Sequence, residues 1–310
     1  MKSGVRLSDG PPNGVSDFSI AVIGDIRVET RARLREQSFG GVLYDHLEFT
    51  PIDSVLSGTA INFAKQAVRW FGAVRVISRI GQDLHTEEIV SYLSRLATSR
   101  TLSISAGAPN GRTIVLRDRD ARRILIAGDT SPIQDLSTSD IQRAEGDIAL
   151  SDAAFADGYL MLAERSRAAL LAALRTANDN GTVFCLDLVP HDMEKYLSLD
   201  GIRPILERSD IIVSQARTLA TLIGLSNEYP YKEQNFGELI PGLAELSEKA
   251  CWYLRHGDHD IGKVTVCQGG REISRYNTGF DKERSMAGFG DRITAAEIHD
   301  YLSRQRTKSS

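Results

Sequence analysis

The segment of this sequence most suited to chemistry is Gly288-Phe289-Gly290-Asp291, which precedes a run of residues that favour helix. Glycines permit tight turns, and the free N–H groups of a turn and of a helix N-terminus together bind anions. Asp291 is therefore either a general base beside a bound phosphate or an N-cap that satisfies free N–H groups. The short segment alone leaves both roles open.

Two further polar segments precede or follow predicted elements near the start of the chain. Ser57-Gly58-Thr59-Ala60-Ile61-Asn62 leads into a helix, where Asn62 either binds the backbone or faces a ligand. Asp25 ends the first predicted strand, and Glu29 follows it. Ligands of open α/β sheets bind outside the carboxyl ends of strands. Asp25 and Glu29 are therefore candidates for binding hydroxyl groups, unless they are merely solvated.

Strands and helices alternate along most of the chain that must position these residues. Short apolar runs predict strands at residues 19–26, 75–81, 153–161, 182–190, 210–215 and 263–268. Near-continuous apolar strands indicate burial on both faces, as in a parallel sheet. Helical periodicity predicts helices over 59–72, ending at Gly72, and over 165–181, ending at Asn180-Gly181. This alternation favours a layered α/β fold.

Two regions break the alternation, at about residues 27–56 and about residues 101–130. The second predicts a hairpin, because TIVLRD and RRILIAG flank a polar turn at Arg119-Asp120. We expect these regions to form a small β lid that stands off the main sheet, with ordinary surface hairpins as the alternative.

The charge balance disfavours nucleic acid and anionic membranes as partners. The 310 residues include 37 Lys and Arg against 41 Asp and Glu, a net charge of −4. No strongly basic footprint is therefore present, and any phosphate must be held by local geometry. No apolar run approaches the roughly 20 residues needed to span a bilayer.

The cysteines and the first residues bear on location and domain organisation. Cys185, Cys251 and Cys267 are widely spaced without a C-x-x-C pair, which disfavours a disulfide framework or zinc site and favours a reducing cytoplasm. Residues 1–18 are rich in Gly, Pro and Ser and are expected to form a flexible leader. Residues 19–310 are expected to form one α/β domain.

Four motifs stand in a recognisable order along the chain: G-D-x-x-x-E at 24–29, S-G-x-x-x-N at 57–62, R-I-G-Q-D at 79–83 and G-x-G-D at 288–291. This order resembles the PfkB, or ribokinase-like, family of carbohydrate and nucleoside kinases, over about residues 19–303. The resemblance implies a three-layer α/β/α sandwich with a mostly parallel sheet and a small β lid over the sugar.

The resemblance also implies roles for individual residues. Asp291 stands where the family has its catalytic base, and the anion hole for the transferred phosphate would be Gly288, Phe289 and Gly290. The substrate side would comprise Asp25, Glu29, Gly58, Asn62 and Arg112. The nucleotide and metal side would comprise Asp187 and Gln215.

The chain departs from the family pattern mainly on the nucleotide side. Ser285-Met286 stands where the family has Asp-Thr, which puts its monovalent-cation loop in doubt. Thr218 stands where the family has a glutamate linked to magnesium and phosphate. Ser57 replaces the first glycine of a pair, and Phe289 replaces an alanine.

The expected function is transfer of the terminal phosphate of ATP or ADP, with Mg²⁺, to a hydroxymethyl group of a sugar, nucleoside or related polyol. We expect a homodimer that pairs through the lid. The alternative is a non-catalytic, ligand-binding or regulatory relative, which the missing acid at Thr218 favours. An NAD-dependent oxidoreductase is disfavoured, because no G-x-G-x-x-G follows the first strand.

Overall fold

The structure, a computed structural model, describes residues 16–41, 47–120, 122–188, 193–225, 231, 233–257, 261–279 and 288–309. Residues 1–15, which make up most of the predicted leader, and Ser285-Met286 of the late motif lie outside the described residues. The first strand begins at Ser16, three residues before the predicted start.

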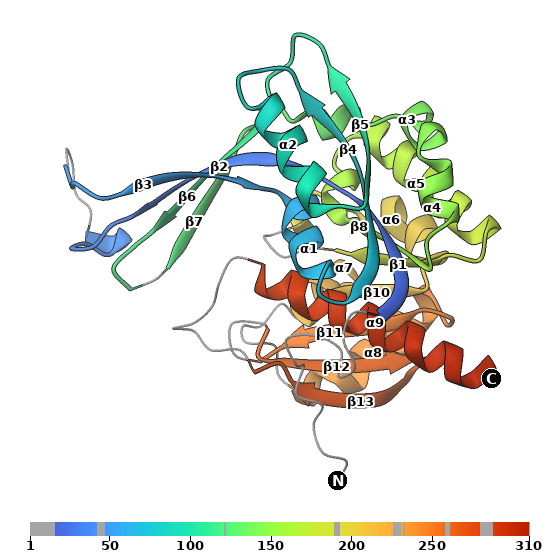
Figure 1. Cartoon of the computed structure of the whole chain (residues 1–310). Helices are drawn as coiled ribbons and strands as arrows, with labels where there is room; N and C mark the ends of the chain where they lie inside the picture. The colour runs from blue at the N-terminus through green and yellow to red at the C-terminus, as the bar shows by residue number, and fades with distance from the viewer. Residues whose placement is uncertain are drawn as a thin grey trace.

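A nine-stranded sheet forms the centre of the molecule, in the order β13-β12-β11-β10-β9-β8-β1-β4-β5 (Figure 1). The strands from β5 to β11 are parallel, and β12 and β13 are antiparallel at one edge. Their bounds are β1 Ser16–Ile23, β4 Phe71–Gly81, β5 Ser99–Ser105, β8 Ala153–Asp157, β9 Val183–Asp187, β10 Ile211–Gln215, β11 Cys251–His256, β12 Lys263–Gln268 and β13 Arg271–Asn277.

Helices cover both faces of this sheet and bury one hydrophobic cluster on each side. Helices α3 to α8 contribute to one cluster, and α1, α2 and α9 contribute to the other. Their bounds are α1 Thr59–Ala67, α2 Thr86–Leu96, α3 Thr138–Arg143, α4 Glu145–Ala149, α5 Glu164–Asp179, α6 Leu199–Leu206, α7 Ala216–Leu222, α8 Phe236–Leu246 and α9 Phe289–Ser309. The predicted three-layer α/β/α sandwich with a mostly parallel sheet is confirmed.

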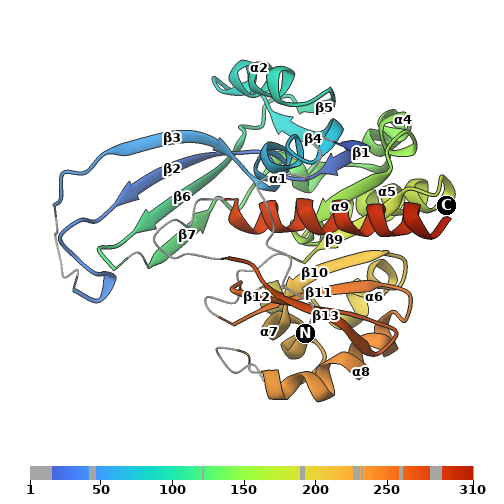
Figure 2. The same ribbon diagram turned by 60° about the horizontal axis from the view of Figure 1, so that its bottom comes forward.

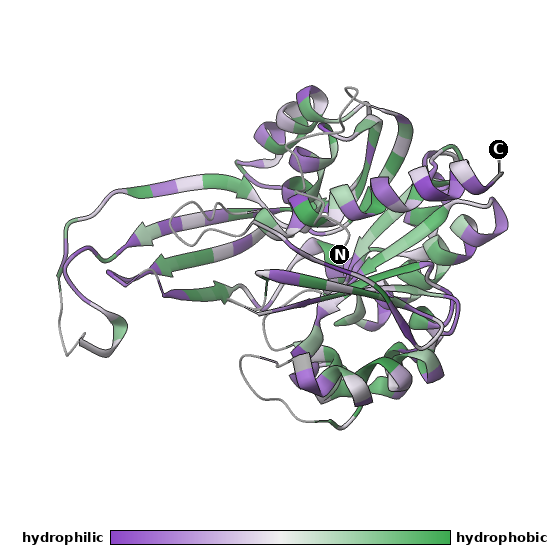
Figure 3. Ribbon diagram, turned by 90° about the horizontal axis from the view of Figure 1, so that it is seen from below, coloured by the Kyte–Doolittle hydropathy of each residue, from purple (hydrophilic) through white to green (hydrophobic). Residues whose placement is uncertain are grey.

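A second sheet of four strands, in the order β3-β2-β6-β7, projects from the body as the lid (Figures 1 and 2). Its strands are β2 Arg27–Arg33, β3 Ile52–Ser57, β6 Gly111–Arg117 and β7 Arg123–Ala127. Strands β6 and β7 form the predicted hairpin. The lid strands alternate between hydrophobic and hydrophilic residues, whereas the central strands of the main sheet are mostly hydrophobic (Figure 3).

Several sequence-based expectations need correction. The helix expected over 59–72 ends at Ala67, and Gly72 lies inside β4. A Cβ on Gly72 would lie 2.7 Å from the carbonyl oxygen of Ser16, so this glycine permits close pairing of β4 with β1. The region expected at 101–130 belongs partly to the main sheet, because β5 pairs with β4. Strands β11 and β13 were not predicted.

The three cysteines are free and buried, on β9, β11 and β12. None of the helices in the described ranges is both long and apolar enough to cross a membrane.

Candidate active site

A cleft of about 1770 Å³ lies between the lid and the carboxyl edge of the main sheet. Every residue that the sequence proposed for the site lines it, with the exception of Arg112. These residues are Asp25, Glu29, Gly58, Asn62, Asp187, Gln215, Gly288, Phe289, Gly290 and Asp291. The fold thus brings together segments from both ends of the chain.

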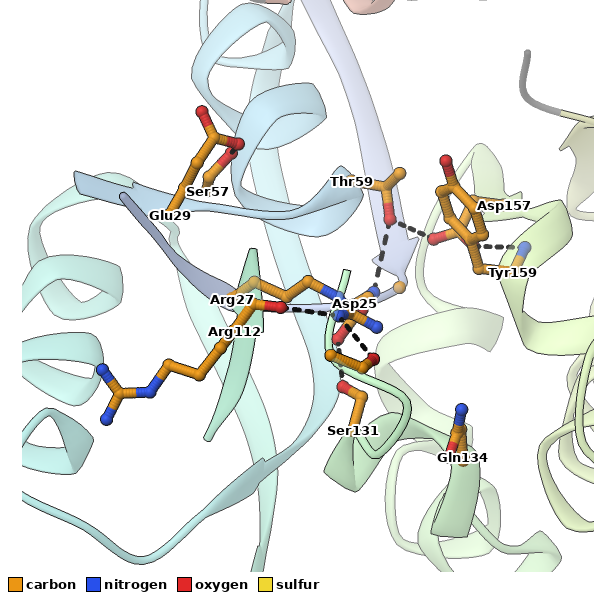
Figure 4. A network of polar contacts seen from close by, with 12 residues as sticks. Asp25, Arg27, Glu29, Ser57, Thr59, Arg112, Ser131, Gln134, Asp157 and Tyr159 are labelled. Carbon is orange, nitrogen blue, oxygen red and sulfur yellow. Dashed lines mark hydrogen bonds and ion pairs between the residues drawn. The ribbon is translucent and has the colours of Figure 1, made fainter. Parts of the chain in front are cut away.

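Arg112 lies outside this cleft. Its Nη2 donates to Oδ2 of Asp83 at 3.1 Å, and its Nη1 lies 3.2 Å from Nε2 of His85. Figure 4 shows the side chain extending away from Asp25. Successive residues of a strand face opposite sides, and Thr113, the next residue of β6, lines the cleft. The structure therefore separates the side chain of Arg112 from the other predicted substrate residues, although its carbonyl oxygen accepts a hydrogen bond from Nη1 of Arg27 at 3.1 Å.

Asp25 is the more buried of the two carboxylates that the sequence analysis proposed for binding the substrate. It forms an ion pair with Arg27 and accepts a hydrogen bond from Oγ of Ser131 at 2.9 Å (Figure 4). Burial raises the pKa of Asp25, and the charge of Arg27 opposes that shift. Asp25 lies in the short connection between the end of β1 at Ile23 and the start of β2 at Arg27, so it links the main sheet to the lid.

Gly58 holds the corner between β3 and α1 against Asp25. Its φ is +94°, and a Cβ there would lie 2.4 Å from the carbonyl oxygen of Asp25. The N–H of Ala60 donates to the same oxygen at 3.1 Å. A side chain at position 58 would push the first turn of α1 away from the strand that ends in Asp25.

A hydrogen-bonded series connects α1 to the lid beside this corner. Nδ2 of Asn62 donates to Oγ of Ser57 at 3.3 Å, and that hydroxyl donates to Oε2 of Glu29 at 2.9 Å. Arg31 forms an ion pair with the same carboxylate. Carboxylate and amide groups that face a cleft can bind the hydroxyl groups of a polyol.

Asp157 is a buried carboxylate that the sequence analysis missed. It ends β8, where it accepts a hydrogen bond from Oγ1 of Thr59 and another from the N–H of Tyr159 at 2.9 Å (Figure 4). Burial raises its pKa to about 7, and the charge of Asp25 adds to the shift. The strand-end rule that singled out Asp25 would have found it, because Asp157 also ends a parallel strand.

Asp291 lies in the first turn of α9, which begins directly after Gly288, a residue with a left-handed φ of +86°. Burial at the floor of the cleft raises the pKa of Asp291 to about 7. The charge of Asp187 adds to this shift, and the charge of Arg255 opposes it. A carboxylate with a pKa near neutrality is suited to proton transfer at physiological pH.

Arg255 is the second important residue that the sequence analysis missed. This buried guanidinium on β11 donates through Nη2 to the carbonyl oxygen of Gly290 at 3.1 Å, and its Nη1 lies 3.7 Å from Oδ2 of Asp187. It also lies 3.5 Å from Oε2 of Glu297. A Cβ on Gly290 would lie 3.0 Å from Nη1 of Arg255, so this glycine permits the close approach.

The carboxylates that line the cleft are the groups that could contribute to a metal site. Within the described part of the chain, no group of three His, Cys, Asp or Glu side chains is placed to hold a metal. Asp187 and Asp291 both line the cleft, whereas Thr218 is buried in α7 and supplies no charge. Mg²⁺ commonly binds one or two carboxylates together with phosphate oxygens and water.

Comparison with known proteins identifies the family. The sequence matches the family described as pfkB family carbohydrate kinase over residues 19–241. The chain belongs to this family. Membership supports a carbohydrate or nucleoside kinase in general, without fixing the substrate. A comparison with curated proteins finds no match.

Solved structures share the ribokinase-like fold of this pfkB-family chain. A ribokinase from Giardia lamblia is 13% identical with a TM-score of 0.71, covering 93% of this chain and 83% of its own. An E. coli protein assigned as ribokinase II, solved with ATP and Mg²⁺, is 19% identical with a TM-score of 0.71, covering 93% and 86%. An adenosine kinase from Sinorhizobium meliloti is 17% identical with a TM-score of 0.68, covering 93% and 88%.

The family match ends before the elements that carry Arg255 and Asp291. Strand β11 and helix α9 follow residue 241, whereas Asp25, Glu29 and Asn62 lie inside the matched range. The predicted substrate residues of this pfkB-family protein thus lie inside the matched range, whereas the predicted anion hole and Asp291 lie beyond it.

Proposed function

We propose that the protein transfers the terminal phosphate of ATP or ADP to a hydroxymethyl group of a sugar, nucleoside or related polyol. One observation carries the proposal: Asp291, with its pKa raised to about 7, follows a glycine turn in a cleft whose other side presents Asp25, Glu29 and Asn62. An acceptor held by those groups would present a hydroxyl toward a carboxylate that can accept its proton.

The residues of the chain divide the work of phosphoryl transfer, which depends mainly on positioning and charge stabilisation. Asp291 takes the proton of the hydroxyl as its oxygen attacks the phosphorus. The N–H groups of residues 288–290 and the N-terminus of α9 stabilise the charge on the phosphoryl oxygens. Asp187 would help to hold a Mg²⁺ ion bound with the nucleotide, and that ion would neutralise further phosphate charge. The lid excludes water, which would otherwise compete as acceptor.

The test compares Asp291→Asn with the native chain in a coupled assay against sugars and nucleosides, with Mg-ATP and with Mg-ADP. Asparagine keeps the shape but cannot accept the proton, so we expect turnover to fall by about 10²–10⁴ while nucleotide and acceptor binding persist. The matched control is Asp300→Asn on the same helix, where the carboxylate is half-exposed and pairs only with Arg304 among the described residues. Undiminished turnover of Asp291→Asn would remove Asp291 from the mechanism.

A non-catalytic relative is the second candidate, and the neutral, buried Thr218 is the observation that favours it. Nucleotide binding without any turnover would support a nucleotide sensor. If neither a nucleotide nor an acceptor raised the melting temperature of the chain, a binding role for other ligands would replace the kinase.

We also propose that two copies pair through their lids. The face of the lid opposite the cleft exposes four isoleucines, Ile52, Ile114, Ile124 and Ile126. Exposed apolar groups of this kind mark interaction surfaces, and the edge strands β3 and β7 can pair with another chain. Light scattering should give twice the chain mass, and Ile126→Asp should give a monomer. A native monomer at micromolar concentration would contradict this arrangement.

A further inference from the structure

We propose that the acceptor is a phosphorylated sugar or polyol, whose phosphate binds an arginine cluster on the cleft face of the lid. The cluster consists of Arg31, Arg33, Arg117 and Arg123, and all four residues line the cleft. This inference rests on the proposed kinase function, because it names the class of acceptor for that same site.

The strand register places the cluster on one face of the lid. Arg33 of β2 lies directly opposite Arg117 of β6, and Arg117 lies directly opposite Arg123 of β7. Residues directly opposite each other present their side chains on the same face of a sheet. Arg31 lies two residues before Arg33 on β2 and shares that face. Three adjacent strands thus bring four guanidinium groups to the cleft.

Such an arrangement is costly without a ligand, because like charges directly opposite each other destabilise a sheet. Partial burial lowers the pKa of Arg117, and the charges of Arg123, Arg31 and Arg33 lower it further, whereas Glu29 opposes them. In the part of the chain that the structure describes, no carboxylate lies within ion-pair distance of Arg33 or Arg117. The lid therefore concentrates positive charge in a protein whose net charge is −4.

The spacing along the strand fits one small phosphorylated acceptor. Glu29, hydrogen-bonded to Ser57, lies on the same face of β2 as Arg31 and Arg33. At about 3.3 Å per residue, Arg31 is about 7 Å and Arg33 about 13 Å further along the strand. A sugar whose hydroxyls bind near Glu29 would place a phosphate within reach of these long side chains. A guanidinium group can donate two parallel hydrogen bonds to two oxygens of one phosphate, which suits this cluster to a phosphate monoester.

Binding without nucleotide provides the first test. We expect hexose phosphates to raise the melting temperature of the native chain, with a smaller shift as sodium chloride screens the charges. The corresponding unphosphorylated hexoses should bind at least about tenfold more weakly, which is the effect expected from one charge-assisted contact. Equal binding of both sugars, or binding insensitive to salt, would overturn the inference.

Kinetics of Arg117→Met and Arg33→Met provide the second test. Each variant should raise KM for the phosphorylated acceptor by about ten- to a hundredfold with a smaller change in kcat, since charge-assisted hydrogen bonds are lost. Arg271→Met is the matched control, because it removes an exposed arginine from β13, away from the cleft. Arg117→Met should fold at least as stably as the native chain, since it relieves repulsion. An unchanged KM in both lid variants would overturn the inference.

The two tests also separate this inference from the proposed function. If the chain binds hexose phosphates through the lid but transfers no phosphate, the kinase proposal fails and the anion site stands. If it phosphorylates neutral sugars and binds no phosphorylated ones, the kinase proposal stands and the anion site fails.

Discussion

Replacing Gly58 by alanine tests the corner that aligns the lid, α1 and Asp25. Gly58 has φ +94° and ψ 158°, a combination essentially confined to glycine. An added Cβ would lie 2.4 Å from the carbonyl oxygen of Asp25 and 2.9 Å from Cα of Ile26. Both contacts are with backbone atoms, so no side-chain rotation can relieve them.

Two effects set the size of the loss. A non-glycine residue in this backbone region costs about 1–3 kcal/mol, and overpacking against a fixed backbone adds about 1–3 kcal/mol. The sum, about 2–6 kcal/mol, is a large share of a typical unfolding free energy of about 5–15 kcal/mol. For a chain of this length about 2 °C is lost per kcal/mol, so the melting temperature should fall by about 4–12 °C.

Two other glycines provide matched controls in calorimetric or circular-dichroism melts. Gly107 also has a positive φ, +78°, but nothing lies within 4 Å of its added Cβ, so Gly107→Ala isolates the backbone strain. Gly146 lies in α4 with neither constraint, so Gly146→Ala should be neutral or stabilising. If Gly58→Ala lost no more stability than Gly107→Ala, the close contact with Asp25 would carry no energy and the reasoning would fail.

Three further outcomes are expected. The kcat/KM should rise with pH and level off above about 7, because Asp291 must be ionised to accept a proton; a profile without that rise would exclude the role. The native state should lose stability as pH rises from 3.8 to about 7, because its Asp157 carboxyl has the raised pKa and holds a proton that the unfolded chain releases. Urea titrations across this range should show a weaker dependence for Asp157→Asn. Gly290→Val should weaken nucleotide binding more than acceptor binding, because its Cβ would crowd Arg255; calorimetry showing the reverse would misplace the phosphate site.

The sequence was sufficient for the main architecture, because the information is local. Strands such as β9 and β10 are apolar along their length, and the β6–β7 hairpin has a polar turn between two β-branched runs. Helix α5 ends as predicted, since Asn180 caps it and Gly181 adopts φ +71°. The predicted end of α1 at Gly72 was wrong, because Gly72 permits the close pairing of β4 with β1, a contact between distant segments.

Of the two site residues that were missed, Arg255 depends on contacts far along the chain, whereas Asp157 ends a strand and could have been found from its position. Strand β11 contains Arg255 and His256, which look like surface residues in sequence yet are buried. Arg255 is compensated by Asp187 and Glu297, and no local pattern reveals such partners. Asp157 was read as part of one apolar run, although its hydrogen bond to Thr59 joins β8 to the start of α1.

Chemical modification of the buried cysteines reports how often the main sheet opens. Burial raises the pKa of Cys185 on β9, Cys251 on β11 and Cys267 on β12, so almost no thiolate is present in the native state. Alkylating reagents and peroxides attack the thiolate. In the native state these thiols therefore react very slowly with such reagents, and a modified thiol shows that this half of the sheet had opened. A ligand that bridges the cleft would lower the rate of cysteine modification without contacting any sulfur atom.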